Sequence, residues 1–108
     1  MNLPTEIFGD VVVVHTPDNI NEEFVDAFSM FLSSLDQTKV IVDLDGSESF
    51  KSEGLEALLD AQDSLRLKHG DLKVMTSSNV NRKILEITRL DHQLEVFDSV
   101  IDAVKSFV

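Results

Sequence analysis

The sequence predicts a single α/β domain over residues 1–108, in which a mixed β-sheet of about four to five strands packs against about four α-helices. Three observations lead to this fold class. The length of 108 residues suits one domain. Short apolar runs alternate with stretches in which apolar residues recur at helical spacing. Only two prolines and four glycines occur, which favours regular elements joined by short turns.

The chain begins with a predicted β-hairpin. Thr5–Phe8 and Asp10–His15 are rich in strand-forming residues and meet at Gly9-Asp10, a pair that suits a tight turn. The run Val11–Val14 has no polar alternation, which is typical of a strand that is covered on both faces. We therefore expect the second strand to lie inside the sheet.

A helix over 21–35 and a second buried strand, Lys39–Leu44, follow the hairpin. Asn19 or Asn21 is the predicted cap of this helix. Its apolar stripe is formed by Phe24, Val25, Phe28, Phe31, Leu32 and Leu35. Because a helix separates two strands, we expect a right-handed crossover and parallel pairing.

The second half of the chain repeats this alternation. A polar loop over 45–52 precedes a helix over 53–68, which ends at His69-Gly70, where glycine is the usual residue after a helix end. Strands are expected at Leu72–Thr76 and Leu94–Phe97. Val80, Ile84, Leu85 and Ile87 mark a helix over 80–89, whereas Asp98 is the expected cap of a final helix with the face Ile101, Val104, Phe107 and Val108.

The charge balance limits the classes of partner. Twenty acidic residues against nine basic ones give a net charge of −11. A field of this sign repels phosphate backbones and anionic lipid, so neither nucleic acid nor a membrane surface is an expected partner. It favours a basic partner surface, or it serves solubility alone. The basic residues Arg82, Lys83 and Arg89 are expected to pair with Glu86 and its neighbours.

The N-terminus and the apolar runs predict a cytoplasmic protein without membrane insertion. The first ten residues lack a basic start followed by an apolar run, so no signal peptide is expected. The longest apolar run, Val11–Val14, is far shorter than the roughly 20 residues of a membrane span.

Several kinds of chemistry find no support in the sequence. The absence of cysteine excludes disulfides, thiolate metal sites and a cysteine nucleophile. The three histidines lack metal-binding spacing, and Asp43, Asp45 and Glu48 lack the pattern of a calcium loop. Neither a phosphate-binding GxxxxGK[ST] loop nor a GxSxG nucleophile motif occurs. We expect no catalytic residue, no metal, no cofactor and no enzymatic activity.

Two stretches of the sequence resemble the STAS domain family. In that family a buried strand of the form vvlDLs leads into DSSGL at the start of a long helix, and here Ile41–Asp45 (IVDLD) leads to Phe50–Leu55 (FKSEGL). The family pattern vrrvLeltgLd, followed by a short strand and dsleeAl, is matched by residues 80–91 and 94–104. The second stretch is the more specific, and the similarity extends over Val11–Val108.

The resemblance implies an anti-sigma factor antagonist. In such proteins the first serine of the motif is phosphorylated by the anti-sigma factor, a serine kinase of histidine-kinase-like ATPase fold. The unphosphorylated form binds that kinase and frees the sigma factor, and a cognate phosphatase resets the cycle. By position the serine is Ser52 and the glycine is Gly54, whereas Lys51 and Glu53 replace the family's aspartate and second serine. Related STAS domains in scaffold proteins and transporter-associated complexes bind constitutively, which is the alternative function.

Ser52 has two interpretations at the start of the predicted helix. In the first, its hydroxyl caps unpaired backbone N–H groups of the helix. In the second, it is a phosphorylation site, where a phosphate adds about −1.5 to −2 charges next to a docked partner. The loops Thr16–Asn19, Gly46–Lys51 and Ser77–Asn79 are expected on the same face, because ligand crevices lie at the carboxyl ends of parallel strands. The predicted partner-binding residues are Asp18, Asn19, Gly46, Ser47, Glu48, Ser49, Lys51, Ser52, Glu53, Gly54, Leu55, Leu58, Ser77, Ser78 and Asn79.

Overall fold

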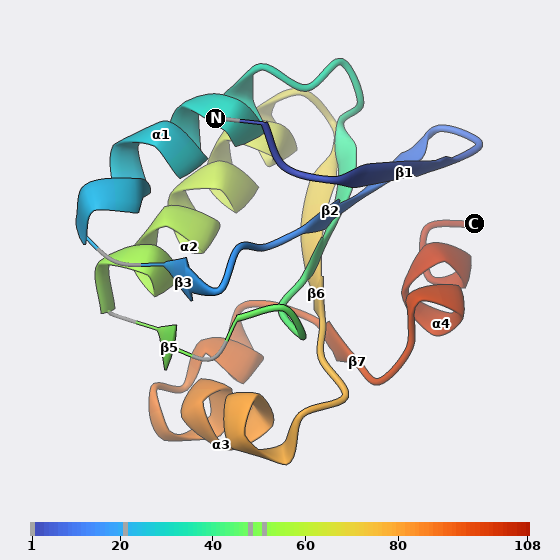
Figure 1. Cartoon of the computed structure of the whole chain (residues 1–108). Coiled ribbons are helices and arrows are strands. Elements are labelled where there is room, and N and C mark those ends of the chain that lie inside the picture. Colours follow the sequence, from blue (N-terminus) through green and yellow to red (C-terminus); the bar gives the residue numbers. More distant parts are fainter. Residues whose placement is uncertain (1, 21, 48, 51) are drawn as a thin grey trace.

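The fold is that of a computed structural model, which describes residues 2–20, 22–47, 49–50 and 52–108. Five strands form the main sheet in the order β1-β2-β4-β6-β7 (Figure 1). Their bounds are Thr5–Phe8, Val11–His15, Lys39–Asp43, Asp71–Met75 and Val96–Phe97. Strand β1 is antiparallel to β2 and all other neighbours are parallel, which confirms the predicted mixed sheet.

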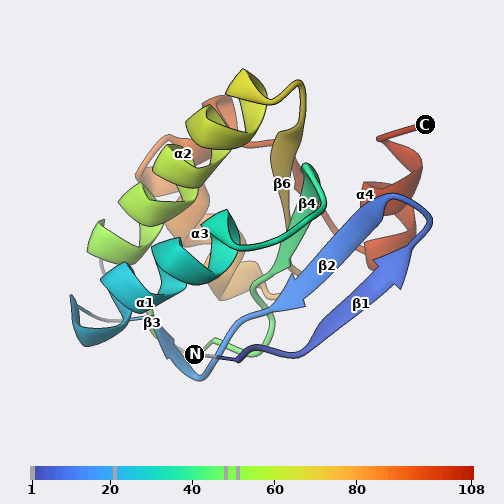
Figure 2. The same cartoon turned by 90° about the horizontal axis from the view of Figure 1, so that it is seen from above.

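Helices cover both faces of this sheet. Helix α1 (Glu22–Ser33) and helix α2 (Ser52–Leu67) lie side by side on one face, and the short α4 (Val100–Lys105) lies on the other (Figure 2). Helix α3 (Asn79–Ile87) and the 3₁₀ turn η1 (Leu90–His92) follow β6. No helix among the described residues is long and apolar enough to span a membrane.

The valine run of β2 separates two hydrophobic cores. Val12 and Val14 belong to the larger core under α1 and α2, whereas Val11 and Val13 belong to the smaller core under α4. Successive side chains of a strand point to opposite faces, so an uninterrupted valine run suits a strand that is covered on both sides. The hairpin pairs Phe8 with Val11 and turns at Gly9, whose φ of +64° favours glycine, as predicted.

Helix α1 connects the parallel strands β2 and β4, as its apolar stripe predicted. Phe28 and Leu32 are fully buried, and Val25, Phe31 and Leu35 pack against the larger core. The side chain of Phe24 lies outside the described part of the chain. The predicted polar loop contains an unforeseen short strand, β5 (Ser49–Phe50), which pairs in parallel with β3 (Asn19–Ile20), where a helix cap was expected.

The end of α2 differs from the prediction. His69, not glycine, adopts the left-handed conformation, with a φ of 64°. The N–H of His69 donates to the Arg66 carbonyl and that of Gly70 donates to the Leu65 carbonyl, which is the Schellman arrangement with His69 as its left-handed residue. Glycine is required at position 70 for a different reason. A Cβ atom there would lie 1.9 Å from the Thr38 carbonyl oxygen.

The last helix also differs in its cap and its buried face. Ser99, not Asp98, caps α4 by accepting a hydrogen bond from the Asp102 N–H, and Asp98 forms an ion pair with Arg82 instead. Ala103 is the fully buried residue of α4, whereas Ile101 and Val108 of the predicted apolar face are exposed. Helix α4 has only six residues, so it offers one narrow face to the sheet.

Helix α3 leaves much of its apolar side uncovered. Leu85 is buried and Ile84 packs against the larger core, but Val80 and Ile87 are 68% and 74% exposed. Helical spacing predicted this helix correctly, and the limited contact between α3 and the core decides which apolar residues are buried.

Candidate functional site

The parallel strands β2, β4 and β6 end at one edge of the sheet, and helices α1, α2 and α3 begin there (Figure 1). We call this region the carboxyl edge and define it as residues 16–20, 44–47, 49–50, 52–55 and 76–81. Hydrogen bonds join the three segments of this edge that follow β2, β4 and β6. The loops that follow the strands therefore lie together, as the topology predicted.

Ser47 ties the segment after β4 to the segment after β2. Its hydroxyl donates to the Pro17 carbonyl at 2.5 Å and lies 2.6 Å from the Thr16 hydroxyl. Thr16 in turn donates its backbone N–H to the Asp43 carbonyl. Gly46 permits this approach, because a Cβ atom there would lie 2.7 Å from the Thr16 carbonyl oxygen. Ser47 is buried, so its hydroxyl is a structural group at this edge.

Asp45 joins the same segment to the loop after β6. Its Oδ1 accepts hydrogen bonds from the Thr76 hydroxyl and the Ser77 N–H, at 2.9 and 2.8 Å. Its Oδ2 accepts one from the Ser77 hydroxyl at 2.6 Å. Partial burial raises the pKa of the Asp45 carboxyl, but the hydrogen bonds from Ser77, Thr76 and the Ser78 N–H outweigh it, so the pKa lies below its ordinary value.

Asn81 holds the first turn of α3 against this edge. It is buried, and its amide Nδ2 donates to the Leu44 carbonyl at 3.1 Å. Ser78 caps the helix by accepting a hydrogen bond from the Asn81 N–H. Sequence reasoning missed Thr16, Asp45 and Asn81 as organising residues. A polar Asn81 between the apolar positions of a predicted helix was the one available signal.

Helix α2 begins at Ser52, and Gly54 is buried in its first turn. Leu55 and Leu58, which were expected to contact a partner, belong to the larger core with 5% and 0% exposure. Asp18 and Gly46 are exposed, and β3 places the backbone of Asn19 beside Ser49 of β5.

The remaining predicted contact residues divide into two groups. Ser77, Ser78 and Asn79 lie together at the start of α3, with Ser77 and Asn79 exposed. Glu48 and Lys51 lie outside the described residues, as do the side chains of Asn19, Ser49, Ser52 and Glu53.

His15 ends β2 next to the carboxyl edge and bridges two carboxylates. Its Nδ1 lies 2.7 Å from Asp43 Oδ2, and its Nε2 lies 2.7 Å from Glu6 Oε1. Burial lowers the pKa of His15, but the hydrogen bonds and negative charges of Glu6 and Asp43 outweigh it, so the pKa is raised above its ordinary value. The cluster connects β1 to β4. Over the described residues, no group of three or more histidines and carboxylates is arranged to hold a metal ion.

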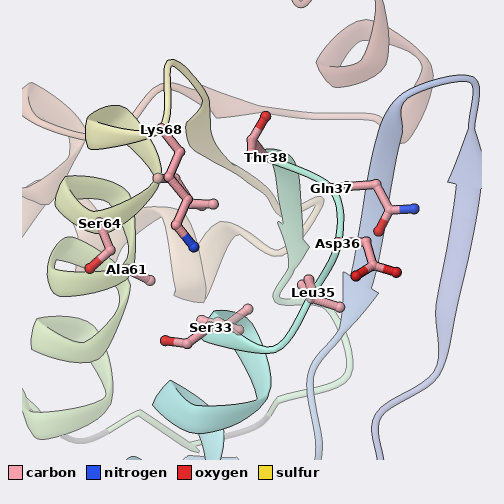
Figure 3. A pocket seen from close by; sticks show the side chains of 10 residues that line it. Ser33, Leu35, Asp36, Gln37, Thr38, Ala61, Ser64 and Lys68 are labelled. Carbon is pink, nitrogen blue, oxygen red and sulfur yellow. The ribbon is translucent and has the colours of Figure 1, made fainter.

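The pocket at the opposite edge has a volume of only about 70 Å³ (Figure 3). It lies between the end of α1, the segment that enters β4, and the C-terminal half of α2. This volume accommodates no more than a few water molecules. This pocket is therefore not a candidate ligand site.

Comparison with known proteins gives a family model and similar folds. The family model described as the STAS domain matches residues 2–103. No curated protein matches the chain. An anti-sigma factor antagonist from Mycobacterium paratuberculosis has a similar structure, with a TM-score of 0.85 and 20% identity over 97% of this chain and 92% of that one.

Two further structures share the fold. A sulfate transporter family protein from Wolinella succinogenes has a TM-score of 0.79 and 16% identity, over 94% of this chain and 87% of that one. The Bacillus cell fate determinant SpoIIAA, in its phosphorylated form, has a TM-score of 0.71 and 17% identity, over 99% of this chain and all of that one. At these identities the likeness shows the fold alone.

Proposed function

Because this chain belongs to the STAS domain family, we propose that it is a cytoplasmic anti-sigma factor antagonist that acts by binding and not by catalysis. Its partner is an anti-sigma factor with the fold of a histidine-kinase-like ATPase. Phosphorylation of Ser52 by that kinase ends the binding, and a phosphatase restores it. The supporting observation is that α2 begins at Ser52, at the edge where three loops meet.

Hydrogen bonds make three other serines of the carboxyl edge less suitable phosphate acceptors. The hydroxyl of Ser47 is buried and bonded to Pro17. The hydroxyl of Ser77 is bonded to Asp45, and that of Ser78 caps α3. A kinase must break a structural hydrogen bond to reach any of these three. Ser52 occupies the position of the family's phosphorylated serine.

The first turn of a helix accepts a phosphate without refolding, because its unpaired N–H groups and the helix dipole favour negative charge. The new group acts on the partner instead. A phosphate brings bulk and about −1.5 to −2 charges, one turn from the exposed Glu56. Within a closed interface, uncompensated negative charge costs several kcal/mol, in order of magnitude, and this is enough to release a partner.

Capture of the partner from an extract of the source cells tests the proposal. Ser52→Ala and Ser52→Asp proteins serve as baits. The alanine form should retain an ATPase-type kinase and the aspartate form should release it. With that kinase and ATP, the intact wild-type protein should gain the mass of one phosphoryl group, and the alanine form should gain none.

Ser99→Asp is a matched control. Ser99 caps α4 through its side chain, aspartate caps equally well, and α4 lies on the other face of the sheet. This variant should retain the kinase. Phosphorylation of the Ser52→Ala protein would exclude Ser52 as the acceptor.

A constitutive role is the second candidate, and it is motivated by the shared fold of the sulfate transporter family protein. In that role the carboxyl edge stays covered and no covalent cycle operates. Equal retention of one partner by the alanine and aspartate baits would favour it.

A further inference from the structure

A groove lies between α2 and the residues that follow α3. It is lined by Leu55, Glu56, Leu59, Thr88 and Leu90, and its volume is about 190 Å³. A cavity of roughly 150 Å³ holds a benzene molecule in another protein, so this groove has room for one branched or aromatic side chain. Four of its five lining residues offer methyl groups, and Glu56 provides the charge.

The groove is continuous with the carboxyl edge. Val80 and Ile84 of α3 and its C-cap residue Thr88 are spaced four residues apart, so they form one row from the start of the helix to the groove. Val80 at one end of this row is 68% exposed, and Ile87 beside the other end is 74% exposed. On α2, position 52 precedes Leu55 and Glu56 by a single helical turn. Exposed apolar residues that lead to an apolar groove are typical of a protein-binding surface.

The α2 side of the groove is acidic. Glu56, Asp60 and Asp63 are exposed and follow each other at helical spacing. None of the ion pairs between described residues involves them. The opposite side carries mixed charges, because the exposed Arg89 lies between the exposed Glu86 and Asp91. The α2 side has acidic residues alone at these positions, so it is the side that a positively charged ligand would face.

We propose that this groove anchors one apolar side chain of the partner protein, on a segment whose lysines and arginines face Asp60 and Asp63. The inference rests on the proposed partner-binding function and adds the chemistry of the partner's docking segment. Asp60 and Asp63 lie about 12 and 16 Å along the helix axis from position 52. These distances exceed the Debye length of about 8 Å at physiological salt, so screening weakens the field of a phosphate at Ser52 at these two carboxylates.

Two helical peptides of about 15 residues are suitable probes. One has a leucine face and a lysine face, and the other carries glutamate in place of lysine. Titration into the ¹⁵N-labelled Ser52→Ala protein should shift the amide signals of Leu59, Thr88 and Leu90 with the lysine peptide only. Replacing the leucines of that peptide by glutamine should abolish the shifts.

Charge reversal at matched sites completes the test. Asp60→Lys should weaken binding of the lysine peptide about five- to tenfold, since a modest surface attraction is lost and a repulsion of similar size replaces it. Asp36→Lys, a charge reversal of another exposed aspartate at the opposite edge, should change binding less than twofold. Shifts that spread over all acidic surfaces, or equal effects of the two variants, would overturn the proposal. Because the probes need neither the kinase nor Ser52, the peptide titration can be interpreted even if the chain does not switch partners.

Discussion

Replacing Gly70 by alanine is expected to destabilise the protein more than the same change at Gly46 or Gly9. At Gly70 the new methyl group would lie 1.9 Å from the Thr38 carbonyl oxygen and 2.6 Å from the Thr38 Cβ. That oxygen accepts the hydrogen bond from the Asp71 N–H that begins the pairing of β4 with β6. The methyl group therefore fits only if the two strands separate at this point.

The three glycines differ in the space available. Real Cβ atoms essentially never approach closer than 3.0 Å, so the contact must open from 1.9 Å at Gly70 but only from 2.7 Å at Gly46. At Gly9 nothing lies within 4 Å, and the cost comes from its φ of +64° alone. Overpacking costs about 1–3 kcal/mol or more. We expect about 3 kcal/mol or more at Gly70, and about 1–2 kcal/mol at Gly46 and at Gly9.

Thermal unfolding followed by circular dichroism measures these differences. About 3 kcal/mol corresponds to a Tm lower by at least about 12 °C for Gly70→Ala, against about 4–8 °C for the other two alanine variants. Gly9→Asn is the control, because asparagine tolerates the left-handed conformation, and it should lose less than Gly9→Ala. If Gly70→Ala melts within a few degrees of Gly9→Ala, the close approach of Thr38 is not a real constraint.

Three further predictions concern single side chains. Asp45→Asn should speed hydrogen exchange of the Ser77 amide and cost about 1 kcal/mol. Because the Asp45 pKa is lowered by folding, this advantage of the wild type should start to decline below about pH 4 and disappear as pH falls through the folded value. An undiminished difference in urea unfolding at pH 3 would contradict this reasoning. The pKa of His15 is raised by folding, so its contribution is complete below about pH 6.5 and is lost as pH rises through the folded value. Wild type should therefore exceed His15→Gln in stability by more at pH 6 than at pH 9, and a difference independent of pH would show that the charged histidine is unimportant. His69→Gly should raise the free energy of unfolding by about 0.5–1 kcal/mol, since glycine has no penalty in the left-handed conformation, and a loss of stability would mean that the histidine side chain has another role.

The candidate site was only partly predictable. Family position indicated Ser52, and parallel strands indicated that the three loops share one edge. The hydrogen bonds of Asp45 and Asn81 join residues more than 30 positions apart, so no local pattern shows them. Leu58 illustrates the opposite error. It lies close to Ser52 in sequence and was predicted to bind a partner, but its side chain lies in the core.

The sequence by itself determined the order and type of the main elements, because the valine run of β2 and the apolar stripe of α1 are local patterns with the period of a strand and of a helix. Tertiary structure decided the pairing of β3 with β5, the left-handed His69 at the end of α2, and the exposure of Val80 and Ile87 on α3. Each of these depends on which distant segment lies beside a residue. Local periodicity carries no information about that neighbour, and so the hydrogen bonds within the carboxyl edge and the adjacent groove were defined only by the folded chain.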